Sequence, residues 1–150
     1  MRIHAVQERD LPDLARLYVA VFNAPPWNDG WSADAAHERI RRLATNPNAV
    51  GVLARDGEVL VSFALGILEP WTNCEHFHLK EMCTAIDQQR RGIGTVILDA
   101  LVRELAARSV MTIYLETRPG SNASAFYRKH GFSAMNLEVL RRPVHADRRP

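Results

Sequence analysis

Cysteine, lysine and long apolar runs are scarce in this chain of 150 residues. Cys74 and Cys83 are the only cysteines and are not spaced as a CxxC pair, so we expect free thiols, a cytoplasmic location and no metal site. No window approaches the roughly 18 apolar residues that a membrane-spanning helix needs, and the first residues lack the apolar core of a secretory signal. We therefore expect no membrane partner.

The formal net charge is only +2, which selects no polyanionic partner. The basic residues are nearly all arginines, since Lys80 and Lys129 are the only lysines. Residues 141–150 form a basic C-terminal tail, and a nucleic-acid arm is one interpretation of it. No aromatic platform or second basic stripe accompanies the tail, so we expect a solvated terminus and no nucleic-acid partner.

Apolar periodicity predicts one α/β domain over residues 1–140. Strands are expected at 2–6, 50–55, 58–69, 76–86, 110–117 and 132–140, and helices at 11–22, 33–45, 92–107 and 121–130. The order β-α-α-β-β-β-α-β-α-β indicates a mixed sheet with helices packed on it. Asp56-Gly57 marks a hairpin between the second and third strands. The arginines of the second helix, Arg39 among them, are expected to face solvent.

A glycine-rich stretch begins the third helix and reads Gln89-Arg90-Arg91-Gly92-Ile93-Gly94. A helix start has unpaired backbone N–H groups and a partial positive charge, and glycine lets an anion approach them. The stretch therefore indicates a phosphate site, although a tight turn that merely uses glycines is the alternative for this motif alone. Walker A and dinucleotide loops do not fit, because Thr95 follows Gly94 and Ile97 replaces a third glycine.

A second segment, Ala125-Phe126-Tyr127-Arg128-Lys129-His130-Gly131-Phe132, runs from the expected fourth helix into the last strand. Together with Q-x-x-G-x-G it resembles two landmarks of the Gcn5-related N-acetyltransferase (GNAT) superfamily, and the order of elements resembles that family from about residue 2 to residue 140. The resemblance implies a mixed central sheet of six to seven strands flanked by about four helices. It also implies acetyl-CoA (coenzyme A) as the cofactor.

The resemblance further implies how the cofactor binds. The pantetheine arm is expected to pair with the backbone of the fourth strand, where the N–H of Met82 or Cys83 would stabilise an oxyanion. The cofactor-binding residues implied are Met82, Cys83, Thr84, Gln89, Arg90, Arg91, Gly92, Ile93, Gly94, Thr95, Asn122 and Phe126. The usual cofactor-contacting asparagine is replaced by Gly120 here, so either Asn122 substitutes for it or the contact is absent.

Two catalytic residues are expected from the resemblance and from the chemistry of the side chains. Tyr127 matches the tyrosine that protonates the leaving thiolate, and a role as one more core aromatic is the alternative. For the general base we rank Glu81 first, then His78, then Glu75. Strand alternation puts His76 and His78 on one face of the sheet and Glu81 on the other unless a bulge intervenes.

The acceptor pocket is expected to form from the first helix, the loop that follows it and the turn between the third and fourth strands. Its candidate residues are Trp27, Trp31, Glu69, Trp71, Glu75 and His78. Tryptophans with carboxylates suit a cationic amine such as an aminoglycoside or a polyamine. The alternative is that Trp27 and Trp71 anchor their loops on the sheet.

The sequence as a whole predicts an acetyl-CoA-dependent N-acetyltransferase that acts by direct transfer in a ternary complex. No motif places a histidine beside Cys83, so a covalent acyl-enzyme is not expected. A non-catalytic module that senses or binds CoA is the main alternative, and a nucleic-acid-binding domain that uses the arginine tail is a third. The exposed last strand and the tail make a homodimer plausible.

Overall fold

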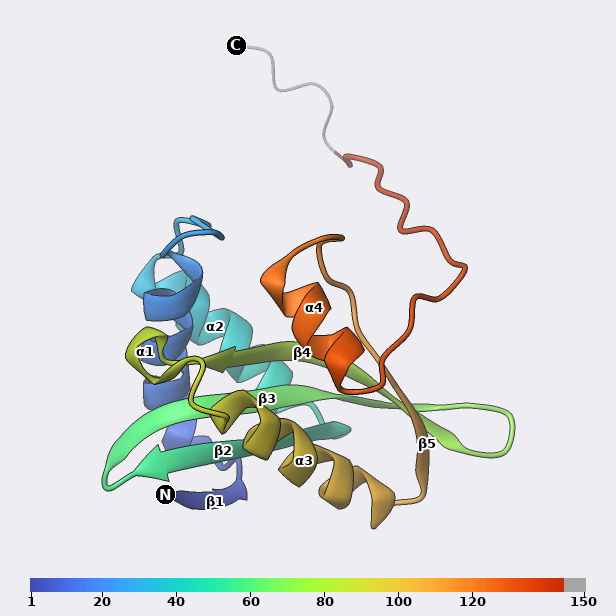
Figure 1. The fold of residues 1–150 in the computed structure, drawn as a ribbon, viewed down its shortest axis with the longest axis horizontal. Helices are drawn as coiled ribbons and strands as arrows, with labels where there is room; N and C mark the ends of the chain where they lie inside the picture. Colours follow the sequence, from blue (N-terminus) through green and yellow to red (C-terminus); the bar gives the residue numbers. More distant parts are fainter. Residues whose placement is uncertain (145–150) are drawn as a thin grey trace. The chain divides into compact units, whose positions relative to one another are not determined.

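The structure is a computed structural model in which residues 1–144 are described (Figure 1). Its contacts divide the chain into two compact units, Met1–Glu116 and Thr117–Pro150, and each unit is described by itself. The basic tail predicted at 141–150 lies partly outside the described residues. None of the helices in the described part of the chain is long and apolar enough to span a membrane.

The first unit contains the sheet and three of the α-helices. Its elements are β1 (Arg2–Ala5), α1 (Leu11–Phe22), α2 (Ala33–Ala44), β2 (Ala49–Asp56), β3 (Val59–Pro70), β4 (Glu75–Thr84), α3 (Ile93–Ala106) and β5 (Val110–Tyr114). Two short 3-10 helices, Glu8–Asp10 and Ile86–Gln88, precede α1 and α3. The second unit contains α4 (Asn122–Lys129). The predicted α/β class is confirmed.

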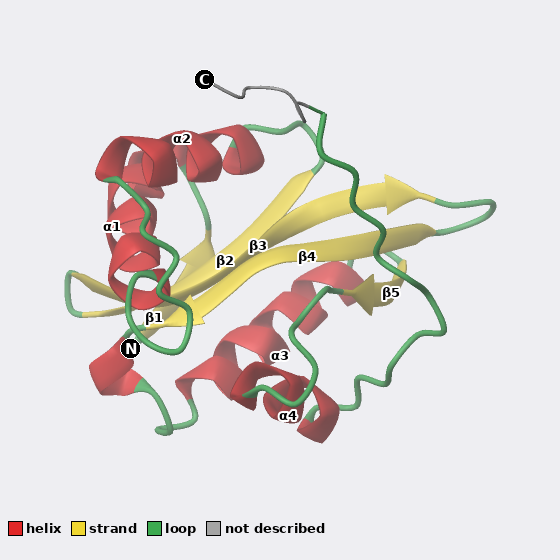
Figure 2. Cartoon of the chain, turned by 90° about the horizontal axis from the view of Figure 1, so that it is seen from above, coloured by secondary structure: helices red, strands yellow, loops and turns green. Residues whose placement is uncertain are grey.

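The sheet has five strands in the order β1-β2-β3-β4-β5 among the described residues. Neighbours from β1 to β4 are antiparallel, and β4 and β5 are parallel. Helices α1 and α2 lie on one face and α3 lies on the other (Figure 2). Side chains along each strand therefore alternate between the two faces of the sheet. Leu53, Phe63 and Leu65 lie on the face that packs against α1 and α2.

The predicted last strand at 132–140 is not a strand in the structure. The apolar residues Met135, Leu137 and Val139 alternate as in a strand, yet they are 58%, 73% and 78% exposed. Alternation alone cannot make a strand, because a strand also needs a neighbour to pair its backbone groups. The described sheet therefore has five strands rather than six to seven, and β5 ends at Tyr114 rather than at 117.

Candidate active site

Strands β4 and β5 pair over only part of their length. Pairing covers Glu75–His78 of β4 and ends where His78 meets Tyr114. The rest of β4, Leu79–Thr84, pairs with β3 alone within the described sheet. One edge of this stretch is therefore not paired with β5, and an unpaired strand edge can accept an extended ligand as an added strand.

The direction of the β4 amides can be read from two hydrogen bonds. The Ala85 N–H donates to the Val61 oxygen at 2.8 Å, across the β3 side. Groups two residues apart in a strand point the same way, so the Cys83 N–H also faces β3, in agreement with the Cys83 oxygen, which accepts from Ser62 Oγ at 2.9 Å. The N–H groups of Met82 and Thr84 consequently face the unpaired edge. Of the two amides proposed for an oxyanion, the geometry favours that of Met82.

The glycine-rich loop follows this edge directly and opens onto α3. Arg90 and Gly92 both have positive φ, 60° and 80°, and a Cβ placed on Gly92 would meet nothing within 4 Å. Gly92 is the N-cap of α3, whose first-turn amides have no acceptor within the helix. Gln89 ties the loop back to β4, since its Nε2 donates to the Thr84 oxygen at 3.1 Å. The loop thus presents amides and two exposed arginine side chains where a diphosphate would fit.

A β-bulge in β4 decides which side chains share a face of the sheet. Glu81 pairs with Leu65 and Leu79 with Gly66, so Lys80 has no partner on β3. His78, which pairs with Ile67, and Glu81 then lie on the same face, the face that carries α1 and α2. Plain alternation would have separated them.

Gly66 shows why the chain can make this close approach at the bulge. A Cβ at Gly66 would lie 2.2 Å from the His78 oxygen and 2.6 Å from the Phe77 ring. Only glycine avoids this collision, because the nearest atom belongs to backbone that cannot move away cheaply.

His78 lies between two carboxylates at the point where β4 and β5 separate. Its Nδ1 is 3.7 Å from Glu69 Oε1 and its Nε2 is 3.6 Å from Glu116 Oε1. The ring stacks on Tyr114 with centroids 4.3 Å apart, and the Tyr114 hydroxyl donates to Glu69 Oε2 at 2.5 Å. Burial and the Glu69 contact raise the pKa of Tyr114 to about 12, so Tyr114 stays protonated. These four residues, Glu69, His78, Tyr114 and Glu116, are called the His78 cluster below.

Glu81, ranked first as the base, is 6% exposed and is paired with Arg39 of α2. Arg39 Nε donates to Glu81 Oε1 at 2.6 Å, and the guanidinium also lies 5.6 Å from the centroid of the Trp31 ring. Burial raises the pKa of Glu81, and Arg39 lowers it in part. Arg39 therefore does not simply face solvent as expected, and the catalytic role of Glu81 stays a prediction.

The three tryptophans predicted for the acceptor pocket lie in two separate places. Trp31 packs edge-on against Tyr18 at 5.3 Å and Trp27 against Phe22 at 5.7 Å, so both anchor the loop between α1 and α2. Trp71 is 63% exposed on the β3–β4 turn and stacks on His76 at 5.0 Å. The tip of this hairpin lies at the opposite end of the sheet from α1 (Figures 1 and 2).

Glu75 is separated from the other acceptor candidates by the face of the sheet that it occupies. It precedes His76 on β4, and neighbouring strand residues point to opposite faces. Its Oε2 is buried and has no hydrogen-bond partner among the described residues. Glu69 and His78 are therefore the predicted acceptor residues that the structure brings together.

In the second unit, α4 fixes the ring of Tyr127 among other aromatic rings. Phe126 and Phe132 pack against Tyr127 with centroids 5.3 and 5.4 Å apart. Ser121 is the N-cap of the helix, because its Oγ accepts from the Ser124 N–H at 3.1 Å, and Asn122 is the exposed first residue of α4.

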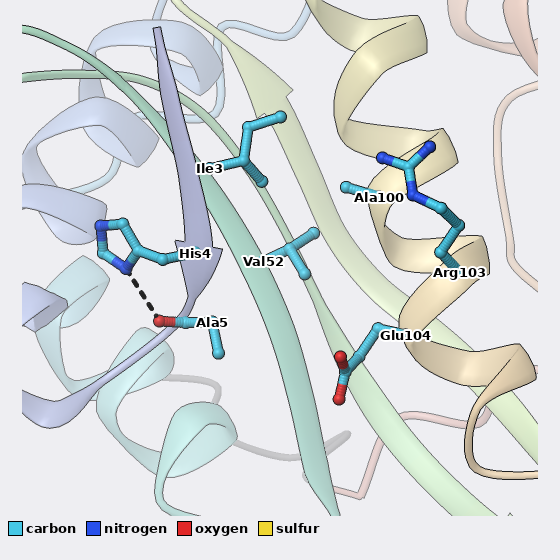
Figure 3. A pocket seen from close by; sticks show the side chains of 7 residues that line it. All are labelled: Ile3, His4, Ala5, Val52, Ala100, Arg103 and Glu104. Carbon is cyan, nitrogen blue, oxygen red and sulfur yellow. Dashed lines mark hydrogen bonds between the residues drawn. The ribbon is translucent and has the colours of Figure 1, made fainter.

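A shallow hollow of about 290 Å³ lies between β1, β2 and α3, on the face of the sheet that carries α3 (Figure 3). Ile3, Val52 and Ala100 give it an apolar floor, with Arg103 and Glu104 at its side. His4 points away from that pair and its Nδ1–H donates to the Ala5 oxygen at 3.0 Å. This hollow lies apart from the His78 cluster and from the loop.

Sequence reasoning missed three residues: Arg39, which pairs with Glu81, and Tyr114 and Glu116 of the His78 cluster. Glu116 could have been found, because the strand expected at 110–117 puts it two positions after Tyr114 and on the same face. Arg39 gave no local signal, since its partner lies 42 residues away.

A model of the acetyltransferase (GNAT) family matches residues 11–132 of the chain. The [ribosomal protein bS18]-alanine N-acetyltransferase of Salmonella typhimurium is 44% identical over 52 residues, 34% of this chain and 35% of that enzyme. The match thus spans about a third of the length of that relative.

Solved structures resemble the chain over nearly its whole length. A possible acetyltransferase from Clostridium difficile 630 has a TM-score of 0.82 at 13% identity, covering 95% of this chain and 97% of that one. The aminoglycoside N-acetyltransferase AAC(6')-Iy in complex with CoA has a TM-score of 0.75 at 15% identity, covering 95% and 94%. At such identities the likeness shows the fold alone.

Proposed function

Because this chain belongs to the acetyltransferase (GNAT) family, we propose that it transfers an acetyl group from acetyl-CoA to a primary amine. The family makes the chain an acyltransferase, and enzymes of this family use acetyl-CoA. The observation that carries the proposal is the edge of β4 that β5 leaves unpaired and that leads into the loop at Gly92.

The coenzyme would be held by backbone along its whole length. The first-turn amides of α3 and the side chains of Arg90 and Arg91 would hold the diphosphate. The edge amides of Met82 and Thr84 would pair with the pantetheine arm. In this proposal the coenzyme supplies an activated acetyl group, and the Met82 N–H stabilises negative charge that develops on the acetyl oxygen.

Direct transfer is favoured over an acyl-enzyme by the state of Cys83. This thiol is 6% exposed, and burial raises its pKa well above the usual value. A thiol that stays protonated is a poor nucleophile, so Cys83 would not accept the acetyl group. Tyr127, held between Phe126 and Phe132, would give its hydroxyl proton to the thiolate that leaves.

The acceptor is proposed to be a small cationic amine, because Glu69 and Glu116 are exposed carboxylates on two sides of the His78 ring. Aminoglycosides and polyamines fit this description. Peptide N-termini also fit, and the similar Salmonella enzyme is named for a protein N-terminal alanine. A cytoplasmic location and a homodimer remain expectations from the sequence.

The test is a screen of aminoglycosides, polyamines and peptide N-termini for release of free thiol from acetyl-CoA. Gly92→Glu should abolish CoA binding, since it puts bulk and negative charge at the diphosphate. Gly57→Glu is the matched control, because Gly57 also has positive φ, 58°, and open space around its Cβ. Unchanged CoA affinity in Gly92→Glu would contradict the proposed diphosphate site at the start of α3. A thermal shift with CoA but no thiol release with any amine would favour the non-catalytic module.

A further inference from the structure

His78 is the one member of its cluster that is both titratable near neutral pH and held between two acids. Its side chain is 12% exposed, whereas Glu69 is 41% and Glu116 61% exposed. The acids therefore face solvent at distances of 3.6–3.7 Å from the ring, which are too long for strong hydrogen bonds. Such an arrangement leaves their oxygens able to bind a further cation.

We propose that Glu69 and Glu116 bind the acceptor as its ammonium ion and that His78 takes the proton which makes this amine nucleophilic. The inference rests on the proposed acetyl transfer and names the base of that reaction. It assigns a catalytic role to His78, with Glu69 and Glu116 as residues that bind the acceptor and position the ring.

The position of the cluster fits this role. The unpaired edge of β4 begins directly after His78 and runs six residues, Leu79–Thr84, toward the loop. Six residues of strand span about 20 Å. An extended ligand whose diphosphate lies at the loop would therefore have its far end near His78, where the two strands separate.

Groups on three segments surround His78 and set its charge. Burial lowers its pKa first and Lys80 lowers it further, while Glu116 and Glu69 raise it. Lys80 Nζ lies 3.5 Å from His78 Nδ1, and Tyr114 stacks on the ring. A lowered pKa keeps the imidazole neutral near pH 7, which is the form that can accept a proton.

Glu81 is less suited to this step. Its carboxylate is buried and already occupied by Arg39 at 2.5 Å. A proton taken by Glu81 would break that ion pair and leave the guanidinium without its anion. Glu81 instead fixes α2 to the bulge beside His78.

The proton balance of the step is simple. The ammonium gives one proton to His78, and the neutral amine then forms the new N–C bond to the acetyl carbon as the C–S bond breaks. The nitrogen loses its second proton, the thiolate gains one from Tyr127, and Tyr127 regains the proton that the nitrogen lost. His78 finally releases its proton to solvent, so the net products are the amide, free CoA and one proton.

The experiment compares His78→Gln with His76→Gln in the full chain, using an amine found by thiol release. His78→Gln should lower kcat by roughly 10²–10⁴-fold and remove the acidic limb of the kcat–pH profile, with CoA affinity unchanged. His76→Gln, on the same strand and face, should keep the limb. A limb retained in His78→Gln, or lost in Glu81→Gln alone, would overturn the inference while leaving acetyl transfer intact.

A second readout does not depend on turnover. The ring protons of His78, followed by NMR, should titrate at lower pH in Glu69→Gln and in Glu116→Gln, because each change removes a carboxylate that raises the pKa. The same variants should raise KM for the amine several-fold. An unchanged His78 titration in both variants would contradict the proposed interaction of His78 with Glu69 and Glu116. No CoA binding by the unaltered chain would instead overturn the proposed function and this inference with it.

Discussion

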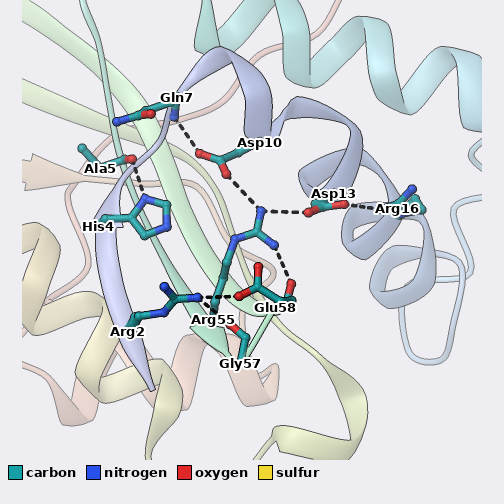
Figure 4. A network of polar contacts seen from close by, with 10 residues as sticks. All are labelled: Arg2, His4, Ala5, Gln7, Asp10, Asp13, Arg16, Arg55, Gly57 and Glu58. Carbon is teal, nitrogen blue, oxygen red and sulfur yellow. Dashed lines mark hydrogen bonds and ion pairs between the residues drawn. The ribbon is translucent and has the colours of Figure 1, made fainter.

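Two regions of this protein hold a base between two carboxylates, and they differ in almost every physical respect. Near the N-terminus, Arg55 of β2 lies between Asp10 and Asp13 (Figure 4). At the β4–β5 junction, His78 lies between Glu69 and Glu116. The two central side chains are equally buried, at 12% exposed.

The Arg55 region is tight and closed. Its ion pairs measure 2.9 Å to Asp10 and 2.8 Å to Asp13, and Nη1 also donates to the Glu58 oxygen at 2.8 Å. Asp10 is 3% exposed in its side chain and also accepts from the Gln7 N–H. These hydrogen bonds raise the pKa of Arg55, which stays a cation at every accessible pH.

The His78 cluster is loose and open by the same measures. Its distances are longer, its acids are exposed, and its base can change charge near neutral pH. The comparison teaches that composition does not separate a closed ion network from an open one. Distance, exposure of the acids and the choice of arginine or histidine separate them.

The largest expected effect tests whether the Arg55 region is structural. Arg55→Met should lower the free energy of unfolding by about 3–5 kcal/mol, because it leaves the buried Asp10 carboxylate without a cation. Urea unfolding measures this loss. His78→Gln should lower it by less than about 1 kcal/mol, since the acids of that cluster reach water. Equal losses in the two variants would break the comparison.

Arg39→Met gives an intermediate case, because Glu81 is buried and its ion-pair partner Arg39 is itself half-exposed. The free energy of unfolding should fall by about 2–3 kcal/mol near pH 8. The loss should be smaller near pH 5. A carboxyl whose pKa is raised on folding stabilises the folded state at low pH, and this stabilisation is lost as pH rises through the pKa of the folded state. The variant lacks the Arg39 charge that lowers the pKa of Glu81, so its loss of stability is larger at high pH.

The matched control for Arg39→Met is Arg41→Met on the same helix. Arg41 pairs with Glu38 on the surface, so this variant should unfold at the same urea concentration as the unaltered chain at either pH. A loss in Arg39→Met that is independent of pH would contradict the account of Glu81.

The smallest effect compares one carboxylate from each region. Asp13→Asn should lower the free energy of unfolding by about 1 kcal/mol, because it weakens a short hydrogen bond to Arg55. Glu69→Gln should change it by no more than about 0.5 kcal/mol, since an amide oxygen can still accept from Tyr114. Urea unfolding of both variants in one buffer measures the difference, and a larger loss in Glu69→Gln would reverse the assignment.

Local signals in the sequence were enough for most of the fold. The Asp56-Gly57 turn and the helix that includes α3 appear as predicted, and Ser32 Oγ caps α2 by accepting from the Ala35 N–H. The loop at Gly92 could also be found, because its signal is short and continuous. The strand at 132–140 failed, since nothing local shows whether a strand has a neighbour. Asp10 stands directly before α1, but its carboxylate binds Arg55 and the Gln7 N–H and does not cap that helix.

The amino-acid sequence by itself determined most elements of this protein and its glycine-rich loop, because both depend on residues within one or two turns of each other. Only the tertiary structure decided which side chains meet. The bulge at Lys80 turned Glu81 onto the face of His78, and the register of β3, β4 and β5 brought Glu69, His78 and Glu116 together. A one-residue slip in a strand reverses every face, so such contacts are fixed by pairing between distant segments.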